Sequence, residues 1–166
     1  MRLPCSSRSK TGFTFVETLF AVGLVATFFV TLFAVSSQCM YFVNASRELL
    51  IAGQTAQSRL DQVRNCTWTQ LTDANYIANN ILNTAVNGSS SLGTVTEVVT
   101  INAFPTAVSP AMQITRSGGT TTINSTNSTI ASGDMATINV LLSWSAAPGA
   151  RSRSLAVSTT WVENVR

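Results

Sequence analysis

The sequence contains no histidine. This absence removes the commonest general base of enzymes and the commonest metal ligand of proteins. The chain also lacks paired carboxylates in a motif, a Cys/His dyad and a glycine-rich phosphate loop after a strand. We therefore expect no enzyme, no cofactor and no metal site.

Charged residues are also scarce. They make up 10% of the 166 residues, whereas a typical soluble domain has about a quarter. The formal net charge of +3 comes from the first dozen residues, which include Arg2, Arg8 and Lys10. The remainder has seven arginines and seven acidic residues, so it is neutral. Because no basic patch is left, we expect no nucleic-acid partner.

The three cysteines are Cys5, Cys39 and Cys66. An odd number without tight spacing is neither a disulfide framework nor a zinc site. In a continuous helix, 27 residues would hold Cys39 and Cys66 about 40 Å apart, too far for a disulfide within one chain.

One long apolar run stands out against this composition. It extends over residues 13–35 and reads "FTFVETLFAVGLVATFFVTLFAV". As a helix, these 23 residues would span roughly 34 Å, enough to cross a bilayer core of about 30 Å. The positive charges before the run predict a cytoplasmic N-terminus, with everything after about residue 37 outside.

Glu17 is the only charged residue in this run. A carboxylate costs about 2.5–3.5 kcal/mol at mid-membrane and less near an end, so it calls for a functional explanation and a partner. Two simpler interpretations remain open. The run is a secretory signal peptide with a small-residue site at "AVSS", or it is a plain signal anchor in which Glu17 is incidental.

The leader, Gly12, "FTFVE" and the apolar helix together resemble the class III signal of type IV pilin-like proteins. That group comprises the pilins, the minor pilins and the pseudopilins of type II secretion. The resemblance implies that prepilin peptidase cleaves between Gly12 and Phe13 on the cytoplasmic side and that Phe13 is then N-methylated. It also implies that Glu17 meets the amino group of Phe13 on a neighbouring subunit.

The same resemblance implies a location and partners. The chain would lie in the bacterial inner membrane as a single-pass protein with a periplasmic C-terminal domain, and would then enter a pilus or pseudopilus. Its partners would be other pilin or pseudopilin subunits, prepilin peptidase and an inner-membrane assembly platform. The ending "VLLSWS…RSRSLAVSTTWV" is also similar to minor pilins of the PilV/GspI-like sort.

After the apolar run, small and apolar residues recur with helical spacing, and polar residues take the opposite face. The apolar row is Cys39, Phe42, Ala45, Leu49, Ala52, Ala56, Leu60 and Val63, and the polar row is Asn44, Gln54, Gln57, Arg59, Asp61 and Arg64. The pattern predicts one helix from about 13 to 65, with a membrane-spanning part at 13–37 and an amphipathic part at 38–66. Gly23 and Gly53 are the points where it could bend.

Residues 67–166 predict a β-rich domain, preceded by the leader at 1–12 and the helix. A short helix is expected near 73–83, and period-two patterns predict strands in 92–104, 111–116, 135–146 and 154–165. The run 120–134 is polar enough for an exposed loop or an edge strand. We expect the final two strands to form a hairpin through the loop 147–153.

The predicted fold class is therefore α+β, with the long helix packed against an antiparallel sheet. Trp144 and Trp161 alternate with polar residues on the hairpin and are expected in the core or in cross-strand pairs. Arg151 and Arg153 are expected to be solvated loop charges.

The predicted function is that of a structural subunit of a type IV pilus or a type II secretion pseudopilus. The alternative is an anchored or secreted β-rich binding domain, resembling an adhesin, with an uncleaved signal anchor.

Overall fold

The computed structural model describes residues 14–86, 92–146 and 151–163, without the side chains of Ala146 and Arg151. The chain divides into two compact units, residues 1–43 and 44–166. The leader at 1–12 lies outside the described residues.

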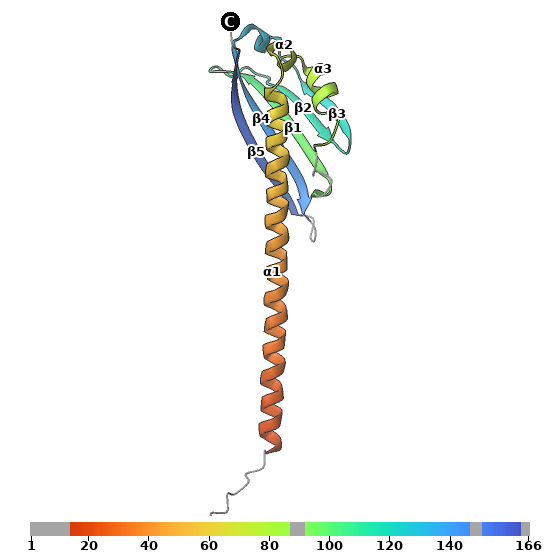
Figure 1. Cartoon of the computed structure of the whole chain (residues 1–166), viewed down its shortest axis with the longest axis vertical. Helices are drawn as coiled ribbons and strands as arrows, with labels where there is room; N and C mark the ends of the chain where they lie inside the picture. The colour runs from red at the N-terminus through yellow and green to blue at the C-terminus, as the bar shows by residue number, and fades with distance from the viewer. Residues whose placement is uncertain (1–13, 87–91, 147–150, 164–166) are drawn as a thin grey trace, which may run out of the picture. The chain divides into compact units, whose positions relative to one another are not determined.

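A single α-helix, α1 (Phe15–Arg64), begins in the apolar run and continues into the second unit (Figure 1). It confirms the predicted helix of about 13 to 65 and runs through Gly23 and Gly53 without interruption. Three threonine hydroxyls in the apolar run donate to backbone carbonyls one turn earlier, at 2.8–2.9 Å. The helix backbone therefore satisfies the hydroxyl groups of these three threonines.

The second unit contains one five-stranded antiparallel sheet with the order β3-β2-β1-β4-β5. Its strands are β1 (Val95–Ala103), β2 (Met112–Ser117), β3 (Thr120–Ser125), β4 (Met135–Ala146) and β5 (Arg151–Val162). The part of α1 within this unit lies across one face of the sheet (Figure 1). The predicted α+β class is confirmed.

Short helices connect α1 to the sheet. They are α2 (Trp68–Leu71), α3 (Ala74–Tyr76) and the π-helical η1 (Ile77–Ile81), and the 3₁₀ helix η3 (Ser128–Ser132) follows β3. The helix predicted near 73–83 is confirmed by α3 and η1. The sequence analysis missed α2, although its "TWTQ" start has the spacing of a capping box, and the Gln70 side chain accepts the Thr67 N–H at 3.0 Å.

The final hairpin follows the alternation of the sequence closely. Strand β4 has the predicted bounds 135–146. Strand β5 begins at Arg151, so the predicted loop of 147–153 is too long. The reason is that pairing with β4 continues in constant register, from Met135 opposite Val162 to Ala146 opposite Arg151.

The core forms where the outer part of α1 meets the sheet. The predicted helix row is confirmed at Ala52, Ala56, Leu60 and Val63, which are buried. They pack in clusters with strand residues that include Val99, Ile101, Ile138, Val140, Leu142 and Trp144.

Other parts of the helix prediction are wrong. Cys39, Phe42 and Leu49 are exposed, the last two at 65% and 52%. Arg59, predicted on the solvent side, is only 1% exposed. The buried face passes through Thr55 and Arg59, because Arg59 forms an ion pair with an acidic residue of the sheet.

Candidate assembly surface

Glu17 lies in the first turn of α1 and is exposed. Its backbone N–H donates to Oγ1 of Thr14 at 3.3 Å, as in the first bond of a capping box. Within the described residues, Glu17 takes part in no ion pair. The predicted cleavage residues Gly12 and Phe13 lie outside the described residues, so the structure does not place them relative to Glu17.

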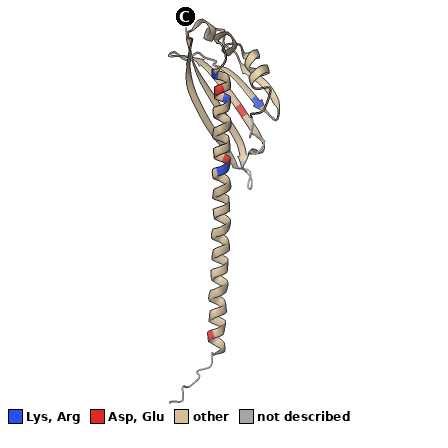
Figure 2. Ribbon diagram, viewed as in Figure 1, with Lys and Arg blue, Asp and Glu red and all other residues tan. Residues whose placement is uncertain are grey.

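From Thr18 to Val35, the helix that follows Glu17 carries no charge, and threonines are its only polar residues. Each residue from Thr14 to Met40 is exposed within the chain. Figure 2 shows that α1 carries no charge between Glu17 and the pair Arg47 and Glu48. The helix is long and apolar enough to cross a membrane. Such a surface needs lipid or other apolar helices around it.

A second apolar patch lies on the part of α1 that belongs to the sheet unit. Leu49 and Leu50 are 52% and 66% exposed, and Gly53 leaves an open notch beside them. Ser46, Gln54 and Gln57 complete a shallow cavity of about 460 Å³. The outer part of the helix thus has one face on the sheet and one apolar face left open.

Arg59 joins the helix to the sheet through a buried ion pair. Its Nε and Nη2 lie 2.8 and 2.7 Å from Oε2 of Glu97 on β1. Burial lowers the pKa of Arg59, and the neighbouring Glu97 carboxylate opposes that shift. Arg116 of β2 reaches the other carboxylate oxygen at 3.5 Å.

The remaining donors of Arg59 hold the end of η1 and the segment that follows it. Nη1 donates to the side chain of Gln62 at 2.8 Å and to the carbonyl of Ile81, and Nη2 donates to the carbonyl of Thr84 at 2.8 Å. Every nitrogen of this guanidinium therefore has an oxygen partner, which a buried charge requires. One side chain fixes the helix, β1 and the connection between them.

Sequence reasoning missed this cluster although one signal was visible. Glu97 stands among the apolar residues of β1 in a period-two pattern, so it must either be exposed or meet a cation. The cation could not be identified, because Arg59 also fits the polar row of the helix.

One arginine of the hairpin lies differently from its prediction. Arg153 is in β5 rather than in a loop, and its Nη1 lies 3.5 Å from Glu48 and 3.4 Å from the carbonyl of Ala45. The prediction of a solvated charge is therefore wrong for Arg153. The Arg151 side chain is outside the description.

The two tryptophans of the final hairpin lie in different environments. Trp144 is 2% exposed and belongs to the core, as predicted. Trp161 is half-buried and stacks on Trp68 with ring centroids 5.2 Å apart, while its Nε1 donates to the carbonyl of Arg64 at 3.0 Å. Strand β5 is thereby fastened to the end of α1.

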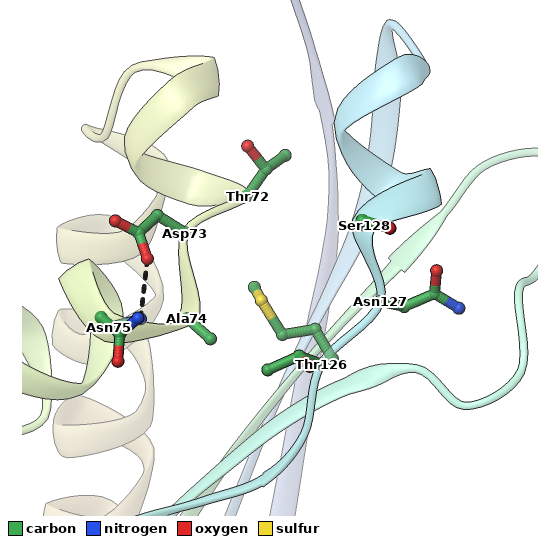
Figure 3. Close-up of a pocket in the computed structure, with 8 residues that line it drawn as sticks. Thr72, Asp73, Ala74, Asn75, Thr126, Asn127 and Ser128 are labelled. Atoms are coloured by element: carbon green, nitrogen blue, oxygen red, sulfur yellow. Dashed lines mark hydrogen bonds between the residues drawn. The ribbon is translucent and has the colours of Figure 1, made fainter.

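A cavity of about 370 Å³ lies where the turn before α3 faces the segment between β3 and η3 (Figure 3). Thr72, Asp73, Ala74, Asn75, Met112, Thr126, Asn127 and Ser128 line it. Two of its polar side chains already accept hydrogen bonds from nearby backbone groups. Asp73 accepts the Asn75 N–H at 2.9 Å, and Asn127 accepts the Thr129 N–H at 3.0 Å. The cavity therefore offers two local helix caps rather than a reactive pair.

Cys39 and Cys66 are free thiols, which agrees with the prediction that they do not pair within one chain. Cys66 is buried, and its burial raises the pKa of the thiol. Among the described residues, no group of three or more acidic residues and cysteines is placed to hold a metal ion.

No family model, no curated protein and no solved structure matches this chain. Its function must therefore be argued from its own residues.

Proposed function

We propose that the chain is a structural subunit of a type IV pilus or a type II secretion pseudopilus, cleaved after Gly12 and assembled through the N-terminal half of α1. One observation carries this proposal. A single carboxylate, Glu17, stands exposed in the first turn of a helix that has no other charge and only threonines as polar residues from Phe15 to Val35.

The physical argument concerns what Glu17 would meet. A lone carboxylate among apolar helices is costly, and so is a lone ammonium. Cleavage between Gly12 and Phe13 creates an ammonium four residues before Glu17. When subunits pack side by side, the Phe13 ammonium of one and the Glu17 carboxylate of the next neutralise each other and favour one axial register.

The remainder of the chain fits a subunit that is first stored in a membrane. The positive leader places the N-terminus in the cytoplasm and the sheet unit in the periplasm. The apolar half of α1 rests in lipid until an assembly platform moves the subunit into the filament, where other helices replace the lipid. The Arg59–Glu97 pair keeps the sheet unit attached to the helix that is moved.

One observation favours the alternative, a membrane-anchored β-rich binding domain. The Thr14–Glu17 hydrogen bond gives this segment a local role, because Thr at the helix start and Glu three residues later are a common N-terminal cap. Under that alternative, Glu17 stabilises the helix start and needs no partner.

Two variants separate these roles. Glu17→Gln removes the charge but keeps the backbone N–H that Thr14 accepts, whereas Thr14→Ala removes the cap and keeps the charge. We expect Glu17→Gln to be inserted and cleaved normally but to fall at least tenfold in sheared filaments, as measured by quantitative immunoblotting. Thr14→Ala should assemble at close to the wild-type level. Equal loss in both variants would favour the capping role. Normal assembly of Glu17→Gln would contradict the charge pair, and the absence of the wild-type chain from sheared filaments would favour the anchored binding domain.

A further inference from the structure

Strand β5 is a long edge strand of the sheet. It has 12 residues, and among the described strands β4 alone pairs with it. Its pairing with β4 keeps one register from end to end, so no bulge twists the edge away. Natural proteins usually protect such an edge with charge, proline, a bulge or a covering segment.

The usual protection is missing along most of β5. Its charged residues, Arg151 and Arg153, stand at its beginning, and residues 154–162 contain neither charge, proline nor glycine. On the face away from α1, the exposed residues Ser154, Ala156, Ser158 and Thr160 are small and neutral. Small side chains would let the backbone of another strand approach closely.

On the face toward α1, β5 carries a row of partly exposed residues. Leu155, Val157 and Trp161 are apolar and half-buried, since each contacts the core on one side only. A further strand beside β5 would cover them and pair with the backbone groups that point away from β4.

The undescribed stretches of the sheet unit are too short to cover this edge. They are 87–91, 147–150 and 164–166. At about 3.4 Å per residue, the longest of these would pair with less than half of β5. We therefore consider a second copy of the chain as the occupant.

We propose that β5 pairs with strand β3 of a second copy of this chain, which continues the sheet from one subunit to the next. Four antiparallel steps separate β3 from β5 in the sheet, so the two edges run in the same direction. Two copies standing in the same orientation can therefore join β5 of one to β3 of the other as parallel neighbours. Each copy keeps its second edge free for the next contact, so the pairing is heterologous and propagates.

Strand β3 has the composition that this pairing requires. It is uncharged, with the sequence "TTTINS", and its outer residues Thr120, Thr122 and Asn124 are exposed. Ile123 is half-buried on the face toward α1, and in the proposed contact it would continue the apolar row of β5 of the neighbouring copy.

The choice of β3 over a second β5 rests on the proposed function. Antiparallel pairing of two β5 edges requires a twofold axis across the strands. Such a dimer is closed and would turn the α1 segments of the sheet units in opposite directions. Subunits that enter one filament from one membrane share an orientation, which only the β5–β3 contact allows.

Cysteine cross-linking tests the contact in whole cells. The native cysteines are replaced, and two copies with different tags are expressed together. One copy carries Thr122→Cys, and the other carries a cysteine at 154, 156, 158 or 160. Because a disulfide needs Cα atoms within about 4.4–6.8 Å, only neighbouring strands react efficiently. We expect one or two of the four β5 positions to give a mixed dimer with Thr122→Cys.

Asn139→Cys is the matched control, because Asn139 is exposed on the same face but lies on the inner strand β4. We expect it to give less than a tenth of the mixed dimer. Adding Ala156→Lys should lower the mixed dimer at least tenfold, whereas Asn139→Lys should leave it unchanged. Dimers only between two copies that carry the same β5 cysteine, or no mixed dimer of any β5 cysteine with Thr122→Cys, would overturn the β5–β3 contact.

Failure of this contact is distinguishable from failure of the proposed function. A chain that is cleaved between Gly12 and Phe13 and enters filaments without β5–β3 cross-links is still a filament subunit. In that case its edge strands do not pair between subunits. A chain that is not cleaved after Gly12 fails the proposed function, whichever cross-links form.

Discussion

Arg59 of α1 and Glu97 of β1 form a buried ion pair across 38 residues of sequence, with contacts of 2.7 and 2.8 Å to one carboxylate oxygen. Glu97 is fully buried and Arg59 is 1% exposed. The pair is the main polar connection between the helix and the sheet, and it lies within the apolar core rather than at its rim.

Glu97→Gln should strongly destabilise the sheet unit. The change leaves the Arg59 guanidinium buried without its counter-charge, and breaking one side of a buried pair typically costs about 3–5 kcal/mol. Urea unfolding of the full chain in detergent, followed by tryptophan fluorescence, measures this loss. Glu163→Gln, at the end of β5, is the control and should change the free energy of unfolding by less than about 0.5 kcal/mol. A loss below about 1 kcal/mol for Glu97→Gln would contradict the importance given to the pair.

Much of this fold is visible in the sequence, because simple periods dominate it. The alternation of Ile138, Val140, Leu142 and Trp144 predicts β4 with its correct bounds. The absence of proline from 13 to 66 and the apolar row predict α1 to within two residues. In both cases one face of a single element is buried, and this is what a periodic pattern reports.

The errors arise where the outcome depends on two elements at once. Leu49 continues the apolar row of α1, but it is exposed, because the buried face passes through Thr55 and Arg59 instead. Arg59 is buried only because the Glu97 carboxylate and the carbonyl groups of Ile81 and Thr84 accept its hydrogen bonds there. A one-dimensional pattern cannot show which strand lies opposite a helix residue. For the candidate site, the sequence identifies Glu17, and the predicted start of the helix puts it in the first turn. The proposed partner of Glu17 belongs to a second chain, so the sequence of one chain does not show the contact.

Trp68 and Trp161 should be coupled in stability. Their rings stack at 5.2 Å with an angle of 26° between the planes. Such pairs contribute about 0.5–1.5 kcal/mol beyond the area that they bury. In a double-mutant cycle with Trp68→Ala and Trp161→Ala, the urea-derived free energies should depart from additivity by that amount. Additivity within about 0.3 kcal/mol would show that the two rings act independently.

Cys66 should make the protein less stable at alkaline pH. Burial raises the pKa of its thiol above the ordinary value of 9.0. The native state therefore keeps a proton that the unfolded state loses, so this contribution to stability is intact below pH 9 and declines as the pH rises further. Cys66→Ala should remove part of the alkaline decline in the free energy of unfolding, measured between pH 8 and pH 10.5.

A labelling experiment checks the same thiol independently. In a background without Cys5 and Cys39, iodoacetamide should modify Cys66 much more slowly in the native protein than in urea at pH 8, since only an accessible thiolate reacts. Equal rates in the two states would contradict both the burial and the raised pKa.

The central claim is that Gly12 and Glu17 belong to one mechanism, in which cleavage creates the ammonium that Glu17 meets. The most direct measurement is the intact mass of the protein after co-expression with a prepilin peptidase. The account predicts a mature chain that begins at Phe13 and carries one added methyl group, with Gly12→Ala as the uncleaved control. A mature chain that begins near Gln38, or one that retains the leader beside an active peptidase, would contradict it.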